Sequence, residues 1–203
     1  MPKAILSEYE FKRMIRRRSL SGAGRKDEVW NGVYVMSPDP DISHQTVVGR
    51  FVFALFNALD DPRATVLPGA NVSDRADDWT RNYRCPDVLV FLPGNPAEDR
   101  RTHFLGGPDF AVEVISPRDR SRKKFAFYAK VGVRELLLVG RDPWALELYR
   151  LRDGAYEPAG VSTPERPDAL ASAVLPLSFR LLPGGTRPEI EATRPADGRL
   201  WTI

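Results

Sequence analysis

Two acidic residues stand at positions in the sequence where carboxylates are unusual. Asp87 comes directly before the apolar run Val-Leu-Val-Phe-Leu, and Glu113 interrupts the run Phe-Ala-Val-Glu-Val-Ile that begins at Phe110. If each run is a β-strand, its side chains alternate between two faces, and Glu113 is the one charged group of an apolar strand. Because burial of an unpaired carboxylate is costly, Glu113 must be a paired structural ion, a protonated acid or a ligand for a cation.

A lysine can complete this pair of acids. If the strands that carry Asp87 and Glu113 are neighbours, the two carboxylates converge on one hard cation such as Mg²⁺ or Mn²⁺, and Lys124 on the following helix reaches the same point. The cation would polarise a phosphate and lower the pKa of a bound water, while the lysine would orient that water or offset developing charge. The pattern indicates phosphodiester hydrolysis. The alternative is a pair of strand-end acids with an unrelated surface lysine.

The composition excludes several other kinds of site. The chain has one cysteine, Cys85, and two histidines, His44 and His103, which are too few for a Cys/His zinc cage. It also lacks the glycine-rich phosphate loop, the dinucleotide-binding fingerprint and the G-x-S-x-G nucleophile motif. We therefore expect a metal bound by oxygen ligands and no organic cofactor.

The distribution of charge is compatible with a polyanionic partner. The 30 basic residues outnumber the 27 acidic ones, for a net charge of +3, and 24 of the 30 are arginines. Basic residues cluster between Lys12 and Lys26 and again between Arg118 and Lys124. Such runs are typical of solvated helix faces as well as of surfaces that bind nucleic acid, so charge alone leaves both interpretations open.

The length of 203 residues predicts one compact domain. Proline is frequent after Gly154, so we expect the domain to span residues 1–183 and residues 184–203 to form an extended or flexible tail. The longest apolar run, residues 51–56, is far shorter than the ~20 residues of a membrane span, and the N-terminus has no signal-peptide pattern. The sequence favours a cytoplasmic protein with no membrane segment.

Helices are predicted at three places. A capping box formed by Ser7 and Glu10 predicts a helix over residues 7–18. Ser43 is expected to cap a second helix, which has one broad apolar face. A third helix follows the second basic run, which puts Lys124 near its start.

Strands are predicted between and after these helices. Asn31-Gly32 is typical of a two-residue hairpin turn, because both central residues of such a turn need a positive φ. Runs rich in β-branched residues predict extended segments at residues 65–72, 86–92, 110–115, 135–139 and 146–150, the second and third of which are expected to be central strands. The order of elements indicates a mixed α/β domain.

Short motifs along the chain occur in a characteristic order. They are Glu28-Val-Trp-Asn-Gly-Val-Tyr-Val-Met-Ser-Pro, His44-Gln, Pro86-Asp-Val-Leu-Val, Val112-Glu-Val-Ile-Ser-Pro, Lys124-x-x-x-Tyr and Gly132-Val-x-Glu. Together they resemble the Uma2 family of restriction endonucleases, within the PD-(D/E)XK nuclease superfamily, over residues 6–182. The resemblance implies a restriction-endonuclease-like α/β fold with a mixed β-sheet flanked by helices, and a DNA endonuclease that depends on Mg²⁺ or Mn²⁺.

The resemblance also implies roles for particular residues. Asp87 and Glu113 correspond to the metal-binding acids, and the carbonyl of Val114 to a further metal ligand. The catalytic lysine of the superfamily corresponds to Lys124 on the following helix, and Lys123 competes for that role because the preceding loop is shorter than in the family.

Two further residues match family positions. Glu28 is interpreted as an acid that supports the metal ligands or binds a second metal, and His44 as a phosphate contact; a hairpin-edge acid and a helix-start histidine are the alternatives. Since one active site per chain cuts both strands of a duplex most easily in a symmetric pair, a homodimer is expected.

Two other functions stay open at this stage. The chain can keep the nuclease fold without catalysis and serve as a module that binds nucleic acid or a protein partner, a reading that the altered loop before Lys124 supports. A structural subunit of a larger defence or mobile-element complex is the third possibility. The functions differ in whether Asp87 and Glu113 together hold a divalent cation.

Overall fold

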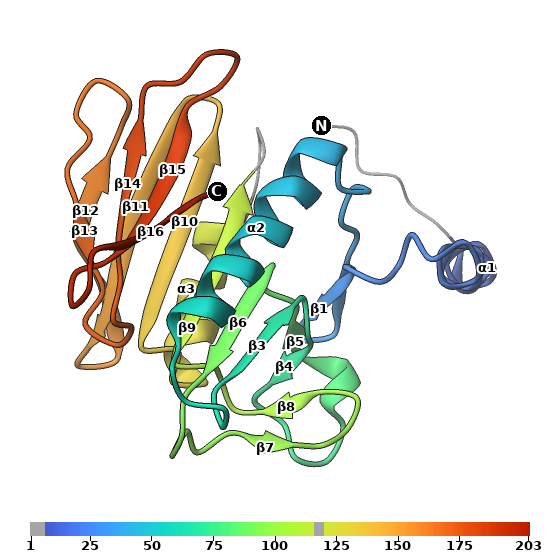
Figure 1. The fold of residues 1–203 in the computed structure, drawn as a ribbon. Helices are drawn as coiled ribbons and strands as arrows, with labels where there is room; N and C mark the ends of the chain where they lie inside the picture. The colour runs from blue at the N-terminus through green and yellow to red at the C-terminus, as the bar shows by residue number, and fades with distance from the viewer. Residues whose placement is uncertain (1–6, 116–119) are drawn as a thin grey trace.

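The computed structural model of the chain describes residues 7–115 and 120–203 (Figure 1). These residues form a mixed α/β fold, as the sequence predicted, with three β-sheets and helices packed against the central sheet. Within the described ranges, no helix is both long and apolar enough to cross a membrane.

The central sheet has the strand order β12-β11-β10-β9-β6-β3. Only β9 and β10 run parallel, and β6 and β9 are interior strands, as predicted. Because β6 is antiparallel to β9, the start of β6 lies beside the end of β9. The six strands are β3 (Thr65–Pro68), β6 (Val88–Phe91), β9 (Phe110–Ile115), β10 (Glu135–Arg141), β11 (Trp144–Arg152) and β12 (Ala155–Ser162).

Helices cover both faces of this sheet. On one face, α2 (Ile42–Ala58) crosses the strands and buries Phe51 against Val112 and its neighbours (Figure 1). On the other face, the short helix η2 (Ser121–Lys124) leads into α3 (Phe125–Lys130), whose Tyr128 is fully buried. The predicted alternation along β9 is confirmed. It directs Glu113 to the same face as α3.

The start of α2 differs from the prediction. Asp41, and not Ser43, is the N-cap: its backbone is extended, with φ −72° and ψ 168°, and its side chain accepts a hydrogen bond from the backbone N–H of His44. Ser43 already lies in the first turn. The helix therefore begins at Ile42, which puts His44 in that first turn as well.

A second sheet lies beside the central one and has the order β2-β1-β5-β4-β8-β7. The predicted hairpin joins β1 to β2 through Asn31 and Gly32, whose φ angles are 49° and 84°. The strands are β1 (Glu28–Trp30), β2 (Val33–Val35), β4 (Val72–Ser73), β5 (Tyr83–Arg84), β7 (Glu98–Asp99) and β8 (Phe104–Leu105), with a 3₁₀ turn, η1 (Trp79–Arg81), before β5.

The predicted strand 65–72 is divided at Gly69. Its first part is β3 of the central sheet, and its last residue begins β4 of the second sheet. Gly69 has φ +61°, a conformation that favours glycine, and its N–H donates to the carbonyl of Asp87. A β-carbon at position 69 would lie 2.2 Å from Nζ of Lys26, so this position must stay open for the lysine.

Residues 184–203 do not form the extended or flexible tail that we expected. They contain β15 (Glu189–Arg194) and β16 (Arg199–Thr202), which complete a third sheet with β14 (Ser178–Leu182) and β13 (Leu170–Ala171). Ile190 and Ile203 are fully buried in the core beneath α2. Proline composition was misleading because most of these prolines lie between strands, at Pro164, Pro167, Pro176, Pro183, Pro188 and Pro195.

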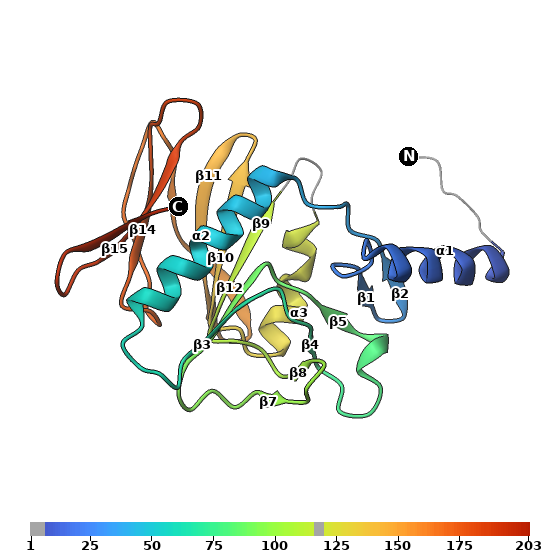
Figure 2. The same cartoon turned by 45° about the vertical axis from the view of Figure 1, so that its right-hand side comes forward.

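The first helix, α1 (Glu8–Ser21), confirms the predicted capping box. The Ser7 hydroxyl accepts from the Glu10 backbone N–H, and the Glu10 carboxylate accepts from the Ser7 backbone N–H. The helix ends at Gly22, in the left-handed conformation with φ +79°. It lies beside β1 and β2 of the second sheet and extends beyond them (Figure 2).

Candidate active site

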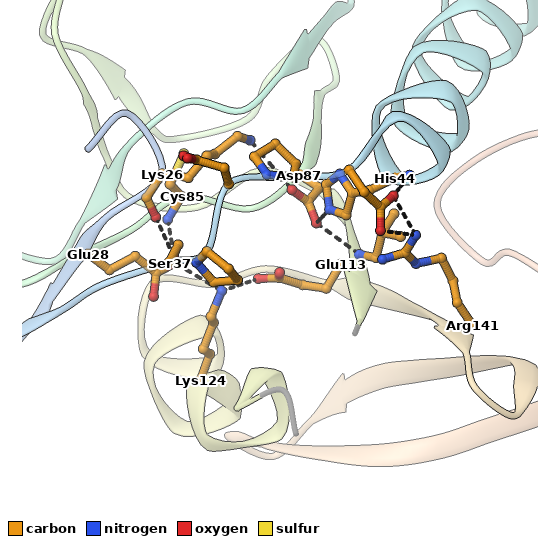
Figure 3. A pocket seen from close by; sticks show the side chains of 14 residues that line it. Lys26, Glu28, Ser37, His44, Cys85, Asp87, Glu113, Lys124 and Arg141 are labelled. Carbon is orange, nitrogen blue, oxygen red and sulfur yellow. Dashed lines mark hydrogen bonds and ion pairs between the residues drawn. The ribbon is translucent and has the colours of Figure 1, made fainter. Parts of the chain in front are cut away.

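A cavity of about 300 Å³ opens where the start of β6 meets the end of β9 (Figure 3). Five acidic side chains line it: Glu28, Asp87 and Glu113 are buried, and Asp39 and Asp41 are exposed at its rim. Basic side chains stand among them: Lys26, His44, Lys124 and Arg141. The cavity therefore concentrates opposite charges, with Glu28, Asp87 and Glu113 buried at its inner end.

Asp87 is fixed to the end of β9 by its backbone and its side chain. Its N–H donates to the carbonyl of Val112 at 3.1 Å, and its Oδ2 accepts from the N–H of Val114 at 2.9 Å. The antiparallel pairing of β6 with β9 creates both contacts. The expectation that the two acid-bearing strands are neighbours is therefore confirmed.

Two basic side chains approach the Asp87 carboxylate from other elements. His44 Nε2, from the first turn of α2, lies 3.2 Å from Oδ2, and Lys26 Nζ, from the loop before β1, lies 3.5 Å from Oδ1. Burial alone would raise the pKa of Asp87. The hydrogen bond from His44, the charge of Lys26 and the Val114 N–H outweigh burial and lower that pKa. Asp87 is thus held as a carboxylate.

Glu113 is in a different electrostatic state. Burial, together with the nearby charges of Asp87 and Glu28, raises its pKa to about 7, although Lys124 and a hydrogen bond from Tyr128 oppose the shift. Lys124 Nζ donates to Oε1 at 2.9 Å, and the Tyr128 hydroxyl donates to the same oxygen. Lys124 and Tyr128 are four positions apart, so they emerge from the same side of the η2–α3 segment.

Lys124 joins Glu113 to Glu28. Its Nζ lies 2.9 Å from Oε1 of each glutamate, and these two charges raise its pKa in spite of burial. Glu28 also accepts hydrogen bonds from the Cys85 backbone N–H at 2.9 Å and from Trp30 Nε1 at 2.6 Å. Lys124 is therefore an ammonium group throughout the ordinary pH range.

The end of α2 that carries His44 is held by a second ion pair. Arg141, at the end of β10, donates to both oxygens of Asp41 at 2.9 and 3.1 Å. Because Asp41 is also the N-cap that accepts from the His44 N–H, this pair fixes the turn from which His44 reaches Asp87. Figure 3 shows Arg141 and His44 at the same side of the cavity.

The donor set is compatible with a hard divalent cation. Asp87 and Glu113 face one cavity, close enough for the charge of Asp87 to raise the pKa of Glu113, and Val114 also lines this cavity. Across residues 7–115 and 120–203, no group of three or more His, Cys, Asp and Glu side chains is arranged to hold a metal. A cation here would thus depend on two carboxylates and a backbone carbonyl, oxygen ligands of the kind that Mg²⁺ and Mn²⁺ prefer.

The structure brings most of the predicted residues together. Asp87, Glu113, Val114 and Lys124 line one cavity, with Glu28 and His44 beside them. Lys123 does not belong to this set: it is exposed, whereas its neighbour Lys124 is turned inward. Between the two lysines that compete for the role, the geometry therefore favours Lys124.

Sequence reasoning missed two contacts in the site. Lys26 was noticed only as part of a basic run, and Tyr128 only as part of a motif. The scarcity of lysine, with six in the chain, was a signal for the first. The spacing of four residues from Lys124 was a signal for the second.

Comparison with known proteins identifies the family. The model of the Uma2 family, described as "Putative restriction endonuclease", matches residues 9–183. The chain belongs to the Uma2 family. This match covers the strands from β1 to β14, the α2 and α3 helices and every residue of the cavity described above.

A solved structure supports the fold of this Uma2 protein. It is the crystal structure of "a putative nuclease belonging to DUF820" from Anabaena variabilis ATCC 29413, at 1.96 Å resolution. The two are 19% identical with a TM-score of 0.55, and the similarity covers 70% of this chain and 79% of the other. No curated protein matches this chain significantly. The descriptions of the family and of this structure both name a nuclease, and the shared fold is that of this solved protein.

Proposed function

We propose that this Uma2 protein is a DNA endonuclease that hydrolyses phosphodiester bonds in the Asp87–Glu113 cavity, with Mg²⁺ or Mn²⁺ as its cofactor. The observation that carries the proposal is the convergence of two carboxylates from adjacent strands and one buried ammonium group, Lys124, on a single cavity. The membership of the Uma2 family supports the same class of activity.

In the proposed site, Asp87, Glu113 and the Val114 carbonyl hold the cation. A bound Mg²⁺ or Mn²⁺ supplies a Lewis acid for the phosphate and a more acidic water. The chain keeps Asp87 ionised through His44 and Lys26, so this ligand is preformed. Glu113, with its pKa near 7, loses a proton as it becomes a ligand.

Lys124 is assigned the role of the catalytic lysine. Its ammonium group stays charged because Glu113 and Glu28 stabilise it, and it lines the same cavity as the proposed metal ligands. If Glu113 served as a cation ligand, Glu28 would remain as the partner of Nζ and would keep the ammonium group at the edge of the cavity. There it offsets negative charge on the phosphate or orients the attacking water.

The proposal extends to the assembly and its location. Each chain offers one such cavity, and cutting both strands of a duplex is easiest for a symmetric pair, so we propose that the active form is a homodimer. The cytoplasmic location that the sequence favours belongs to the same proposal.

Cleavage of a mixed DNA pool tests this function. We expect the wild-type protein to cut DNA with Mg²⁺ or Mn²⁺ and to stop when a chelator is added. Asp87→Asn should lose cleavage, and Asp168→Asn, which changes an exposed aspartate far from the cavity in the same chemical way, should keep it. Equal cleavage by wild type and Asp87→Asn would overturn the assignment.

One observation favours the second candidate, a nuclease-fold module that binds without cutting. Lys124 already pairs with both Glu113 and Glu28 in the cavity, so these acids have a cationic partner from the chain itself. DNA binding that is unaffected by a chelator and by Asp87→Asn, together with no cleavage under any metal, would support that module instead.

A further inference from the structure

The helix α1 makes little use of the protein core. None of its residues is buried, and both Figures 1 and 2 show it beyond the edge of the second sheet. Its inner side touches the hairpin through Phe11, whose ring meets that of Tyr34 edge-on at 5.8 Å between centroids. Its hydrophobic packing is therefore slight for a helix of 14 residues.

The sequence nevertheless stabilises α1 at both ends. The Ser7–Glu10 capping box satisfies its N-terminal donors, and Gly22 ends it in the left-handed conformation. Isolated helices of this length are marginal in water even with good helix formers. The caps therefore stabilise a helix that leaves most of its surface open to solvent.

An ion pair fixes the base of α1 at the entrance of the cavity. Arg18 donates through Nε and Nη2 to the buried carboxylate of Asp27, each at 2.7 Å. The same Nη2 donates to the carbonyl of Ser37 at 2.8 Å, and Ser37 lines the proposed active site. The direction of α1 is therefore set relative to the cavity.

Three arginines form a stripe on the outer surface of α1. Arg13, Arg16 and Arg17 are three and four positions apart, so they share one side of the helix, and all three are exposed. Among the described residues, none of the three forms an ion pair, in contrast to Lys12, which lies 2.6 Å from Glu8. The stripe is a row of positive charge available to a ligand.

We propose that Arg13, Arg16 and Arg17 bind the phosphate backbone of duplex DNA outside the active-site cavity. This inference rests on the proposed function and specifies how the substrate is held. A guanidinium group donates in a planar fork that matches phosphate oxygens. The stripe rises about 6 Å along the helix, and a DNA strand presents a charge about every 3.4 Å along its axis, so the stripe spans neighbouring phosphates.

The anchor at Arg18 gives this contact a consequence for cleavage. Because α1 is tied to Asp27 and to the Ser37 carbonyl, a duplex that lies along the stripe is directed past the cavity. The contacts involve phosphates alone, so they strengthen binding to every sequence equally. A long duplex benefits from them, whereas a fragment that reaches only the cavity does not.

Salt dependence of DNA binding tests the stripe directly. A labelled duplex several helical turns long is titrated by anisotropy in the presence of a chelator, so that binding is measured without cleavage. Replacing Arg13, Arg16 and Arg17 by Gln removes three phosphate contacts, which should lower the slope of log affinity against log salt by about 2.7. Between about 50 and 200 mM salt, the wild type should then lose about 40-fold more affinity than this variant.

Two matched variants control for net charge and for folding. Replacing Arg152, Arg166 and Arg199 by Gln removes the same total charge from exposed positions in the other half of the chain and should keep the wild-type slope. Replacing the α1 stripe by Lys keeps three charges and should restore most of the slope.

The outcomes separate this inference from the proposed function. If the wild type binds DNA with a steep salt dependence, but the stripe variant and the control Gln variant have the same slope, the stripe is not a DNA contact. If the wild type does not bind DNA at all, the proposed function itself fails. Two other results would overturn the inference, each with a DNA slope that is unchanged in the stripe variant. Loss of binding to phosphatidylserine-containing vesicles would assign the stripe to a membrane. Loss of self-association would assign it to a second copy of the chain.

Discussion

Buried carboxylates lie at both ends of the central sheet, and the two ends treat them differently. At the start of β9 and β10, the chain satisfies both oxygens of each acid. Glu135 accepts from Arg150 Nε at 2.7 Å and the Ala173 N–H at 2.8 Å on Oε1, and from the Ser172 hydroxyl on Oε2. This carboxylate holds the third sheet to the central one.

Asp109 at the same end of the sheet follows the same rule. Its Oδ2 accepts from the Leu92 N–H at 2.7 Å and Asn95 Nδ2 at 2.9 Å, and its Oδ1 from Arg134 Nη1 at 3.0 Å. Hydrogen bonds of this number offset the cost of burying a charge. Asp109 is a structural anion.

At the other end of the sheet, Asp87 and Glu113 face each other's charge across a cavity. The described contacts of Glu113 all fall on Oε1, where Lys124 and Tyr128 meet. Burial and the nearby charge of Asp87 raise the pKa of Glu113 to about 7. The comparison teaches that burial of a carboxylate does not identify a site. The feature that separates Asp87 and Glu113 from Glu135 and Asp109 is one cavity lined by both acids.

The largest expected effect on cleavage comes from replacing Glu113 by Gln, and the same replacement at Glu135 is its control. Glu113→Gln should lower cleavage by at least about a hundredfold, because it removes a proposed metal ligand. Glu135→Gln should leave the cleavage rate per folded molecule unchanged and lower the free energy of unfolding by about 2 kcal/mol, because Arg150 and Ser172 lose their partner. Cleavage rates and urea unfolding of both variants measure this contrast. A Glu135→Gln enzyme that folds but does not cut would break the comparison.

The two neighbouring lysines should differ in the next largest effect. Lys124→Ala removes the ammonium group between Glu28 and Glu113, and we expect single-turnover cleavage to slow by about a hundredfold. Lys123→Ala changes an exposed side chain beside it and should alter the rate by less than about twofold. Equal effects of the two substitutions would contradict the assignment of Lys124.

Lys26 and Gly69 give a smaller and more specific test. Lys26→Gln removes the charge 3.5 Å from Asp87 and should reduce kcat by about tenfold. Gly69→Ala should have a similar effect, because its β-carbon would displace Nζ of Lys26 and because φ is +61° there. One combination of results would contradict this role. If Lys26→Gln is as fast as wild type, and the double variant is no slower than Gly69→Ala alone, the lysine has no role in the rate. Gly69→Ala then acts only by lowering stability.

The smallest expected effect is the pH dependence of metal binding. Glu113 must lose its proton to bind a cation, so the apparent affinity for Mn²⁺ should fall about tenfold per pH unit below about 7 and level off above it. In the metal-free protein, the folded state holds this proton more tightly than the unfolded chain, whose value is near 4.5. Stability should therefore fall as pH rises from about 4.5 to 7, and Glu113→Gln should abolish that part of the dependence. A flat affinity from pH 5 to 8 would contradict the raised pKa.

Much of the site could be predicted because it depends on local pattern. A lone glutamate in an apolar strand and an aspartate at the start of another are visible in the sequence, and adjacency of their strands follows from the fold class. Lys26 could not be predicted in this way: it meets Asp87 across 61 positions, and its Nζ passes so close to Gly69 that a β-carbon there would lie 2.2 Å away. Contacts of this kind arise from tertiary packing that no local pattern encodes.

The fold was predicted less well toward its C-terminus. The hairpin at Asn31-Gly32 and the ends of α1 follow from residue types that few other conformations accept. In residues 184–203, prolines suggested irregular chain, yet they mark the turns between paired strands. Composition averaged over a segment hides where its prolines fall, and here their positions mattered more than their number.

Calorimetric titration with Mn²⁺ tests the central claim most directly, because it needs no knowledge of the DNA target. The wild-type protein should bind one cation per chain at pH 8. Glu113→Gln should lose that binding, and Glu157→Gln, an exposed glutamate changed in the same way, should keep it. Binding that survives in Glu113→Gln, or its absence from the wild type with and without DNA bound, would contradict a metal site formed by Asp87 and Glu113.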